Sequence, residues 1–141
     1  MVGISLETVE PNAQQVRSLL AAADRNIADA HLTGLSEENQ FDAAYKAIMQ
    51  LAMLGLIANG YRPLTSKPGH HQTAIQTLAL TVQWPSQKIW PLDALRKQRN
   101  LTDYSGDLVT QAAVDSCLTN AMALRGHVHA WLLAQRPDWL V

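Results

Sequence analysis

Apolar residues recur at alternating intervals of three and four along most of the chain, the spacing that places them on one face of an α-helix. This pattern predicts one helix over residues 11–31 and a second over residues 37–59. Ser36 offers a side-chain oxygen to the free amides at the start of the second helix. Asn59-Gly60 suits the left-handed turn that commonly ends a helix.

Three further helices are predicted in the second half of the chain. Helical spacing resumes over residues 72–82, and the next helix begins at Ser86 or at Pro91. A long last helix follows from the apolar positions between Val114 and Trp131. Residues 61–69 contain two prolines and a glycine and are expected to form a loop.

No segment alternates between apolar and polar residues as a β-strand does, and no repeat indicates a solenoid. We therefore expect an all-α protein, an antiparallel up-and-down bundle of four to five helices. One domain over residues 1–141 is predicted, with its core at about residues 11–135 and terminal extensions at residues 1–10 and 136–141.

Composition and charge narrow the class of protein. The 141 residues are 48% hydrophobic and 16% charged, as in a globular domain with a lightly charged surface that a second subunit can partly cover. A net charge of -1 gives no global positive field, so any contact with nucleic acid must be local.

The sequence also indicates a cytoplasmic protein. Its single cysteine, Cys117, cannot form an internal disulfide, and Glu7 and Glu10 lie where a secretory signal would carry basic and apolar residues. The most apolar run, residues 47–58, is shorter than the roughly 20 residues that cross a bilayer. It is expected to be a core helix, with no membrane partner.

Arg99 is the most informative polar residue. It follows Leu92 by seven positions and Leu95 by four, which turns it toward the apolar stripe of its helix. An unpaired guanidinium would be costly there, so Arg99 needs an acceptor. The candidates are Asp103, a carboxylate of a partner chain, or a bound phosphate that matches its forked donors.

Two interpretations of this helix end stay open. In the structural one, Arg99, Asn100 and Asp103 close the helix and position Tyr104. In the functional one, Arg96 and Lys97 join Arg99 in a short basic cluster that makes a local phosphate contact.

The same residues resemble a known family. The run Arg-Asn-Leu-Thr-Asp-Tyr at residues 99–104 resembles an Arg-Asn-x-x-Asp-Tyr form of the signature of HEPN-domain proteins. Two upstream segments resemble an uncharacterised bacterial branch of that family, namely Phe-Asp-Ala-Ala-Tyr-Lys-Ala at residues 41–47 and Gly-Tyr-Arg-Pro at residues 60–63 with Gly-His-His at residues 69–71. The resemblance spans about residues 36–131 and implies a helical HEPN-like bundle.

Many HEPN proteins are metal-independent ribonucleases, often toxins of toxin-antitoxin pairs, and an arginine and a histidine from each chain of a dimer line one cleft. The resemblance therefore implies a homodimer, RNA or a nucleotide as ligand, and an antitoxin or a nucleotidyltransferase as partner. It implies catalytic roles for Arg99, Asn100 and Tyr104, and binding roles for Arg96, Lys97, Asp103, His70 and His71.

One position departs from the family motif, in which a histidine follows the arginine after four to six residues. Here the fifth residue after Arg99 is Tyr104, and a phenol with a pKa of about 10 exchanges protons poorly at neutral pH. Three hypotheses follow: a ribonuclease, a non-catalytic module that binds a nucleotide, an anion or a protein, and a purely structural interaction protein.

The remaining histidines and the cysteine have simpler interpretations. His70 and His71 are adjacent, so their side chains diverge on a helix and do not easily chelate one metal ion. His127 and His129 are expected to be structural, and Cys117 a small core residue. No metal and no cofactor is predicted.

Overall fold

The computed structural model describes residues 6–64, 69–106 and 108–140, apart from the side chains of Asp103 and Tyr104. Its helices are α1 (Ala13–Ala30), α2 (Glu37–Ala58), α3 (His70–Gln76), α4 (Leu78–Thr81), α5 (Ile89–Ser105) and α6 (Gln111–Gln135). Two 3-10 turns, η1 (Ser86–Lys88) and η2 (Pro137–Leu140), and two strands, β1 (Leu6–Thr8) and β2 (Tyr61–Pro63), complete it. The prediction of an all-α antiparallel bundle is confirmed, with one very small sheet in addition.

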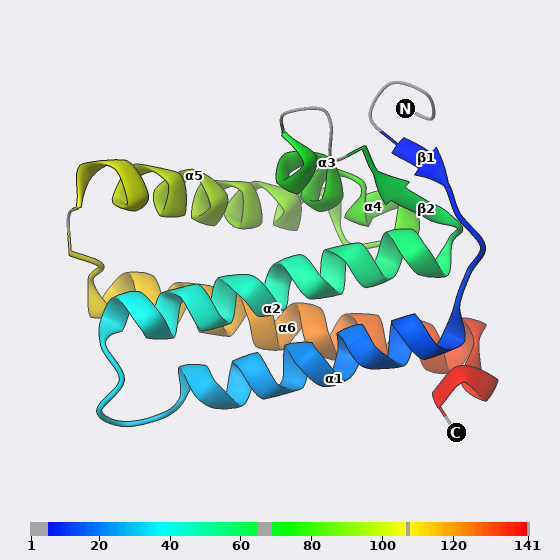
Figure 1. The fold of residues 1–141 in the computed structure, drawn as a ribbon, viewed down its shortest axis with the longest axis horizontal. Helices are drawn as coiled ribbons and strands as arrows, with labels where there is room; N and C mark the ends of the chain where they lie inside the picture. The colour runs from blue at the N-terminus through cyan, green and yellow to red at the C-terminus, as the bar shows by residue number, and fades with distance from the viewer. Residues whose placement is uncertain (1–5, 65–68, 107, 141) are drawn as a thin grey trace.

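The four long helices, α1, α2, α5 and α6, alternate in direction along the chain, and α2 lies among the other three (Figure 1). Helices α1 and α6 pack against α2, while α5 lies on the other side of α2 from α1. The short helices α3 and α4 lie beside the C-terminal half of α2, and α3 also packs against α5. Residues from α2, α3 and α5 therefore meet on one side of the bundle.

Helix α2 is the centre of the core because it is apolar on nearly all of its sides. Its start is as predicted: the Ser36 side chain accepts a hydrogen bond from the amide of Asn39, and Glu37 and Glu38 occupy the first turn. It ends at Asn59 and Gly60, and Gly60 has the positive φ of 88° that glycine tolerates.

In the described part of the chain, α2 is the one helix that is long and apolar enough to cross a membrane by length and composition alone. Of its most apolar window, 72% is buried inside the bundle. That burial agrees with the predicted core helix and is compatible with a soluble protein.

Some boundaries differ from the predictions. Helix α1 begins at Ala13, because the side chain of Asn12 accepts a hydrogen bond from the amide of Gln15 and caps it two residues later than expected. The helix predicted over residues 72–82 is divided into α3 and α4. At the division, the Thr77 hydroxyl donates to the carbonyl of Ala74, a local side-chain bond that competes with regular helix geometry.

The described parts of the terminal segments, residues 6–10 and 136–140, pack against the rest of the chain. Strand β1 pairs antiparallel with β2, with Leu6 opposite Pro63, so residues 61–63 are a strand and not a loop. Leu6 is buried in the core. At the other end, Trp139 of η2 is buried, and its carbonyl accepts a hydrogen bond from Arg17 of α1. Both ends thus close over the bundle.

Candidate functional site

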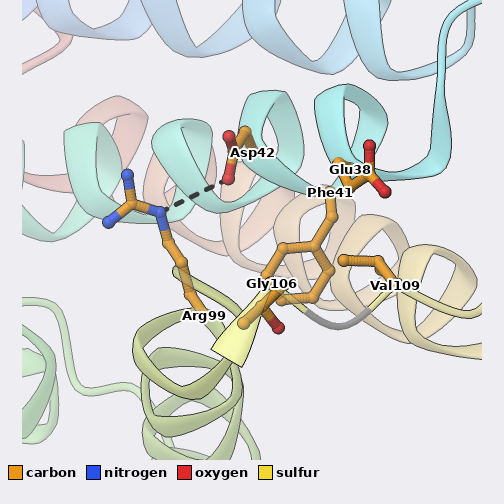
Figure 2. Close-up of a pocket in the computed structure, with 7 residues that line it drawn as sticks. Glu38, Phe41, Asp42, Arg99, Gly106 and Val109 are labelled. Atoms are coloured by element: carbon orange, nitrogen blue, oxygen red, sulfur yellow. Dashed lines mark ion pairs between the residues drawn. The ribbon is translucent and has the colours of Figure 1, made fainter. Parts of the chain in front are cut away.

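Arg99 lies on the side of α5 that faces α2, as its spacing from Leu92 predicts. Its Nε atom is 3.4 Å from Oδ1 of Asp42, the ion pair drawn in Figure 2. The guanidinium carbon also lies 5.1 Å from the centre of the Tyr45 ring, which is a cation–π distance. Since 32% of the Arg99 side chain is exposed, the cation is held against α2 and is still accessible to a ligand.

One carboxylate that pairs with Arg99 comes from α2, a different helix from that of Asp103. Asp42 lies 57 positions before Arg99, and it was noted only as part of a resemblance, with no role assigned to it. A signal was present in the sequence, because Asp42 and Lys46 lie one turn apart and are the charged residues of α2 beyond its first turn. The side chains of Asp103 and Tyr104 lie outside the described residues, so the roles predicted for them stay predictions.

His71 joins the site from the first turn of α3. Its Nδ1 atom is 3.3 Å from the Tyr45 hydroxyl, and its ring meets the ring of His70 edge-on at 4.7 Å between centres. Tyr45 is only 3% exposed, so its hydroxyl is a fixed anchor for the imidazole. Tyr45 thus contacts both Arg99 and His71, although these two residues are separated by 28 positions in the sequence.

The environment keeps both of these rings uncharged at neutral pH. Burial lowers the pKa of His71 below its ordinary value of 6.5, and charge interactions with His70, Arg99 and Arg96 lower it further. Burial raises the pKa of Tyr45 to about 12, although Arg99 and Arg96 partly oppose this shift. A neutral imidazole beside a cationic guanidinium can accept a proton while the guanidinium holds an anion.

Three hollows open around Arg99, and each of them is lined in part by its side chain. One of about 380 Å³ lies between α2 and the end of α5 and is bordered by Asp42 (Figure 2). Another of about 250 Å³ lies between the start of α3 and α5. The third, of about 280 Å³, extends over α2 as far as Leu19 of α1. We call this joined surface the Arg99 groove, defined by Asp42, Tyr45, His71, Arg96, Arg99 and Asn100.

No protein-family model matches this chain, and no curated protein or solved structure matches it. The resemblance to HEPN proteins therefore stays a prediction, and the Arg99 groove is the structural feature that bears on function.

Of the predicted basic cluster, Arg96 and Arg99 line the groove and Lys97 does not. Arg96 lines the hollow beside His70 and His71, and its Nε donates to Asp93 at 2.8 Å. That hydrogen bond is the main reason that the pKa of the buried Asp93 is lowered. Lys97 instead lies 3.5 Å from the other oxygen of Asp93 and over the exposed Trp90 ring. It lines none of the three hollows, so the structure does not bring this predicted binding residue into the groove.

Asn100 and His70 do line the hollow that Arg96 and His71 share, as the predicted binding and catalytic roles require. In the parts of the chain that the structure describes, no three His, Cys, Asp or Glu side chains are grouped so that they could hold a metal ion.

The predictions for the other polar residues of the core agree with their positions. Cys117 is fully buried beside the carbonyl of Phe41, and burial raises the pKa of its thiol to about 12. On α6, Nε2 of His127 lies 2.7 Å from the carbonyl of Val82 and its ring is edge-on to Trp84. Cys117 and His127 stabilise the packing, and neither lines any of the three hollows.

Proposed function

We propose that this chain is a cytoplasmic, HEPN-like protein that binds a phosphodiester of RNA in the Arg99 groove and cleaves it by the metal-independent route that the resemblance implies. The observation that supports this most directly is that Arg96, Arg99 and His71 line one hollow. A guanidinium matches the oxygens of a phosphate, and an imidazole exchanges a proton near neutral pH.

In the proposed reaction, the 2'-hydroxyl oxygen of a nucleotide attacks its own 3'-phosphorus. The new O2'–P bond forms and the P–O5' bond breaks, which gives a 2',3'-cyclic phosphate and a free 5'-hydroxyl. Nε2 of His71 takes the proton of the 2'-hydroxyl, and water or Tyr104 supplies a proton to the departing O5'. Arg99 stabilises the negative charge that gathers on the phosphorane oxygens.

The anchoring of His71 supports its role as the proton acceptor. The Tyr45 hydroxyl can accept a hydrogen bond as well as donate one. When Nδ1–H of His71 donates to that hydroxyl, Nε2 carries a lone pair and can act as a base. His71 would thus supply the imidazole that the family motif carries after its arginine, but from another helix.

The resemblance also implies an assembly, which belongs to the proposal. A homodimer would bring two Arg99 grooves together, and an antitoxin or a nucleotidyltransferase would be the natural partner protein. The described surface includes large exposed apolar side chains near the groove on α5, Trp90 and Leu101, which suit a covered face.

A non-catalytic binding module is the second candidate, and one observation favours it. Asp42 already neutralises part of the charge of Arg99, and Glu38 lines the same hollow. A carboxylate next to the guanidinium competes with a phosphate, so this half of the groove suits a neutral or cationic group better than a long polyanion.

Cleavage of labelled single-stranded RNA by the purified protein in excess chelator tests the proposal. We expect His71→Gln to lower the cleavage rate about 10²–10⁴-fold, the usual contribution of a general base. Arg99→Lys should lower it about 10²–10³-fold, since a lysine cannot reproduce the forked contact. Two variants outside the groove are matched controls: His129→Gln, and Arg125→Lys, whose arginine is paired with Asp24 as Arg99 is with Asp42. Equal rates for the groove variants and the controls would reject the assignment, and binding without cleavage would favour the second candidate.

The pH dependence adds a check that is specific to His71. Cleavage needs the neutral imidazole, so its rate should rise with pH through the pKa of His71. Because that pKa is lowered from 6.5, the rate should reach half of its plateau below pH 6.5 and should fall off only in more acidic solution. The residual activity of His71→Gln should lack this acid limb.

A further inference from the structure

The hollow over α2 continues beyond the Arg99 groove and changes character as it does so. Its lining includes Tyr45, His71 and Arg99 at one end and three apolar side chains, Leu19, Met49 and Met53, farther along. We call these three residues the methionine slot. Leu19 belongs to α1 and the two methionines to α2, helices that lie next to each other in Figure 1.

A second basic hollow borders the one that holds the methionine slot. Lys46 and Gln50 line both this hollow of about 460 Å³ between α1 and α2 and the hollow of the slot, and Arg25 and Asn26 line the former. The amide oxygen of Gln50 accepts a hydrogen bond of 2.9 Å from Asn26, which fixes the side chain between the two hollows. The slot therefore borders two cationic groups, Arg99 of α5 and Lys46 with Arg25 of α1, and these two helices lie on opposite sides of α2.

The charges along this path favour an anionic ligand. The hollow beside α3, the slot and the hollow between α1 and α2 are lined by four cationic side chains, Arg25, Lys46, Arg96 and Arg99, and by two carboxylates, Asp29 and Asp42. The chain as a whole is slightly negative, so the excess of positive charge is local.

We propose that the methionine slot binds one nucleobase of a single-stranded polynucleotide, with the phosphate on one side of that nucleotide at Arg99 and the next phosphate at Lys46 and Arg25. A flat, polarisable base suits a slot walled by two thioethers, and its volume of about 280 Å³ is small for a drug-sized ligand but sufficient for one base. A paired base stays inside its duplex and cannot enter the slot, so the site selects single strands. This site rests on the proposed function for its ligand class, since both expect a phosphate at Arg99.

Two features of the exposed surface allow a base in the slot while its two phosphates lie beside the same end of the slot, one at Arg99 of α5 and one at Lys46 and Arg25. Met53 and Leu19 are half-buried, so the slot opens to solvent, while Met49 is 7% exposed and forms its floor. Asp42, Lys46, Met49 and Met53 follow one another at three- and four-residue steps and therefore lie along one stripe of α2.

Binding of a 2'-O-methyl tetranucleotide tests the site separately from catalysis, because a 2'-O-methyl group cannot attack the phosphate. One labelled oligonucleotide carries four bases, and four others carry an abasic nucleotide at one position each. We expect the abasic replacement to weaken binding to the wild-type protein roughly tenfold at one position and much less elsewhere. A duplex of the same sequence should bind more weakly than the single strand.

Two variants connect that loss to the residues. Met53→Gln should remove the difference between the base-containing and the abasic oligonucleotide, whereas Met122→Gln, at an exposed methionine of α6, should retain it. Lys46→Gln should weaken all the oligonucleotides by a similar factor and lower the salt dependence by about one ion, and Lys88→Gln should not. Matched thermal unfolding of the variants checks that each one is folded.

The outcomes separate this site from the proposed function. No loss at any abasic position, or a loss that Met53→Gln leaves in place, overturns the base site even if the protein cleaves RNA. A base-dependent, Met53-dependent loss supports the site even if the protein cleaves nothing, in which case the proposed catalysis fails and the binding remains.

Discussion

Helices α2 and α5 pack against each other, yet they are built in opposite ways. Helix α2 buries 13 of its 22 residues, and its neighbours α1 and α6 enclose most of it. Among the described side chains of α5, only Leu92, Asp93 and Leu95 are buried, while Trp90 and Leu101 are 73% and 69% exposed. Most of the stability of this fold should therefore come from α2, because apolar burial is the main favourable term in folding.

The difference explains how a small domain can hold charged groups without losing its fold. Helix α5 contributes the cations Arg96 and Arg99, whose partners are carboxylates at the edge of the core. Helix α2 contributes the exposed Asp42 and the buried Tyr45, which contact Arg99, while Arg96 pairs with Asp93 of α5 itself. The well-buried helix α2 thus orients the guanidinium that the more exposed helix α5 carries.

A substitution in each helix should show the contrast at its largest. Leu51 of α2 is fully buried, and Leu51→Ala should lower the free energy of unfolding by about 2–5 kcal/mol, through lost burial and an unfilled cavity. Leu101→Ala on α5 should change it by no more than about 0.5 kcal/mol, because that side chain is mostly in water. Urea unfolding followed by circular dichroism measures both. A large cost for Leu101→Ala that depends on protein concentration would mean that an assembly covers the outer face of α5.

The packing of α4 against α2 depends on a glycine. Gly55 of α2 lies so close to α4 that an added Cβ would be 2.8 Å from Oγ1 of Thr81 and 3.3 Å from Cγ1 of Val82. We expect Gly55→Ala to destabilise the protein by about 1–3 kcal/mol, as overpacking does, although alanine is the better helix former. The matched control is Gly126→Ala on α6, where a Cβ meets no atom within 4 Å and the gain should be up to about 1 kcal/mol.

Thermal unfolding of both variants decides this prediction. If Gly55→Ala is as stable as Gly126→Ala, α4 can move away from α2 at little cost. The close approach of Gly55 to Thr81 then does not hold α4 in place. Adding Thr81→Ala to Gly55→Ala should recover part of the loss, because the nearest clashing atom is then absent.

The elements that could be predicted from sequence are those set by local signals. Ser36 with two glutamates after it marks the start of α2, and Asn59-Gly60 marks its end, because capping depends on neighbouring residues. The pairing of β1 with β2 was missed because each strand has three residues and the partners are some 55 positions apart. Such short strands carry too few residues for alternation to appear.

In the candidate site, too, only the features that a local pattern specifies could be predicted. The direction of Arg99 follows from its spacing on α5, and the sequence predicts it correctly. Its acceptor Asp42 and the contact of Tyr45 with His71 depend on how three helices pack, and no local pattern specifies that. For the adjacent histidines the residue spacing speaks only against a shared metal ion, and the hollow that His70 and His71 line with Arg96 and Arg99 depends on how α3 packs against α5.

The smallest expected effect is a loss of unfolding free energy at alkaline pH, which should come from the buried core and not from the Arg99 groove. The Cys117 thiol is fully buried between α6 and α2, and burial raises its pKa from 9.0 to about 12. In the unfolded chain the thiol ionises above pH 9, while in the folded protein it stays protonated, so the folded state binds more protons and stability must fall as pH rises. The expected loss is about 1 kcal/mol between pH 9 and pH 10 from this one group. Tyr45, whose pKa is raised from 10.0 to about 12, adds to the loss mainly above pH 10. Cys117→Ala should therefore flatten the dependence of unfolding free energy on pH between 9 and 10, measured by urea titration with a reductant present.

His71 has a lowered pKa and affects stability on the acid side, so His71→Gln should leave the alkaline part of that dependence unchanged. An alkaline loss that is equally large in Cys117→Ala would place its origin in the exposed charges of the surface, and the contrast between a core that responds to alkali and a groove that responds to acid would be wrong.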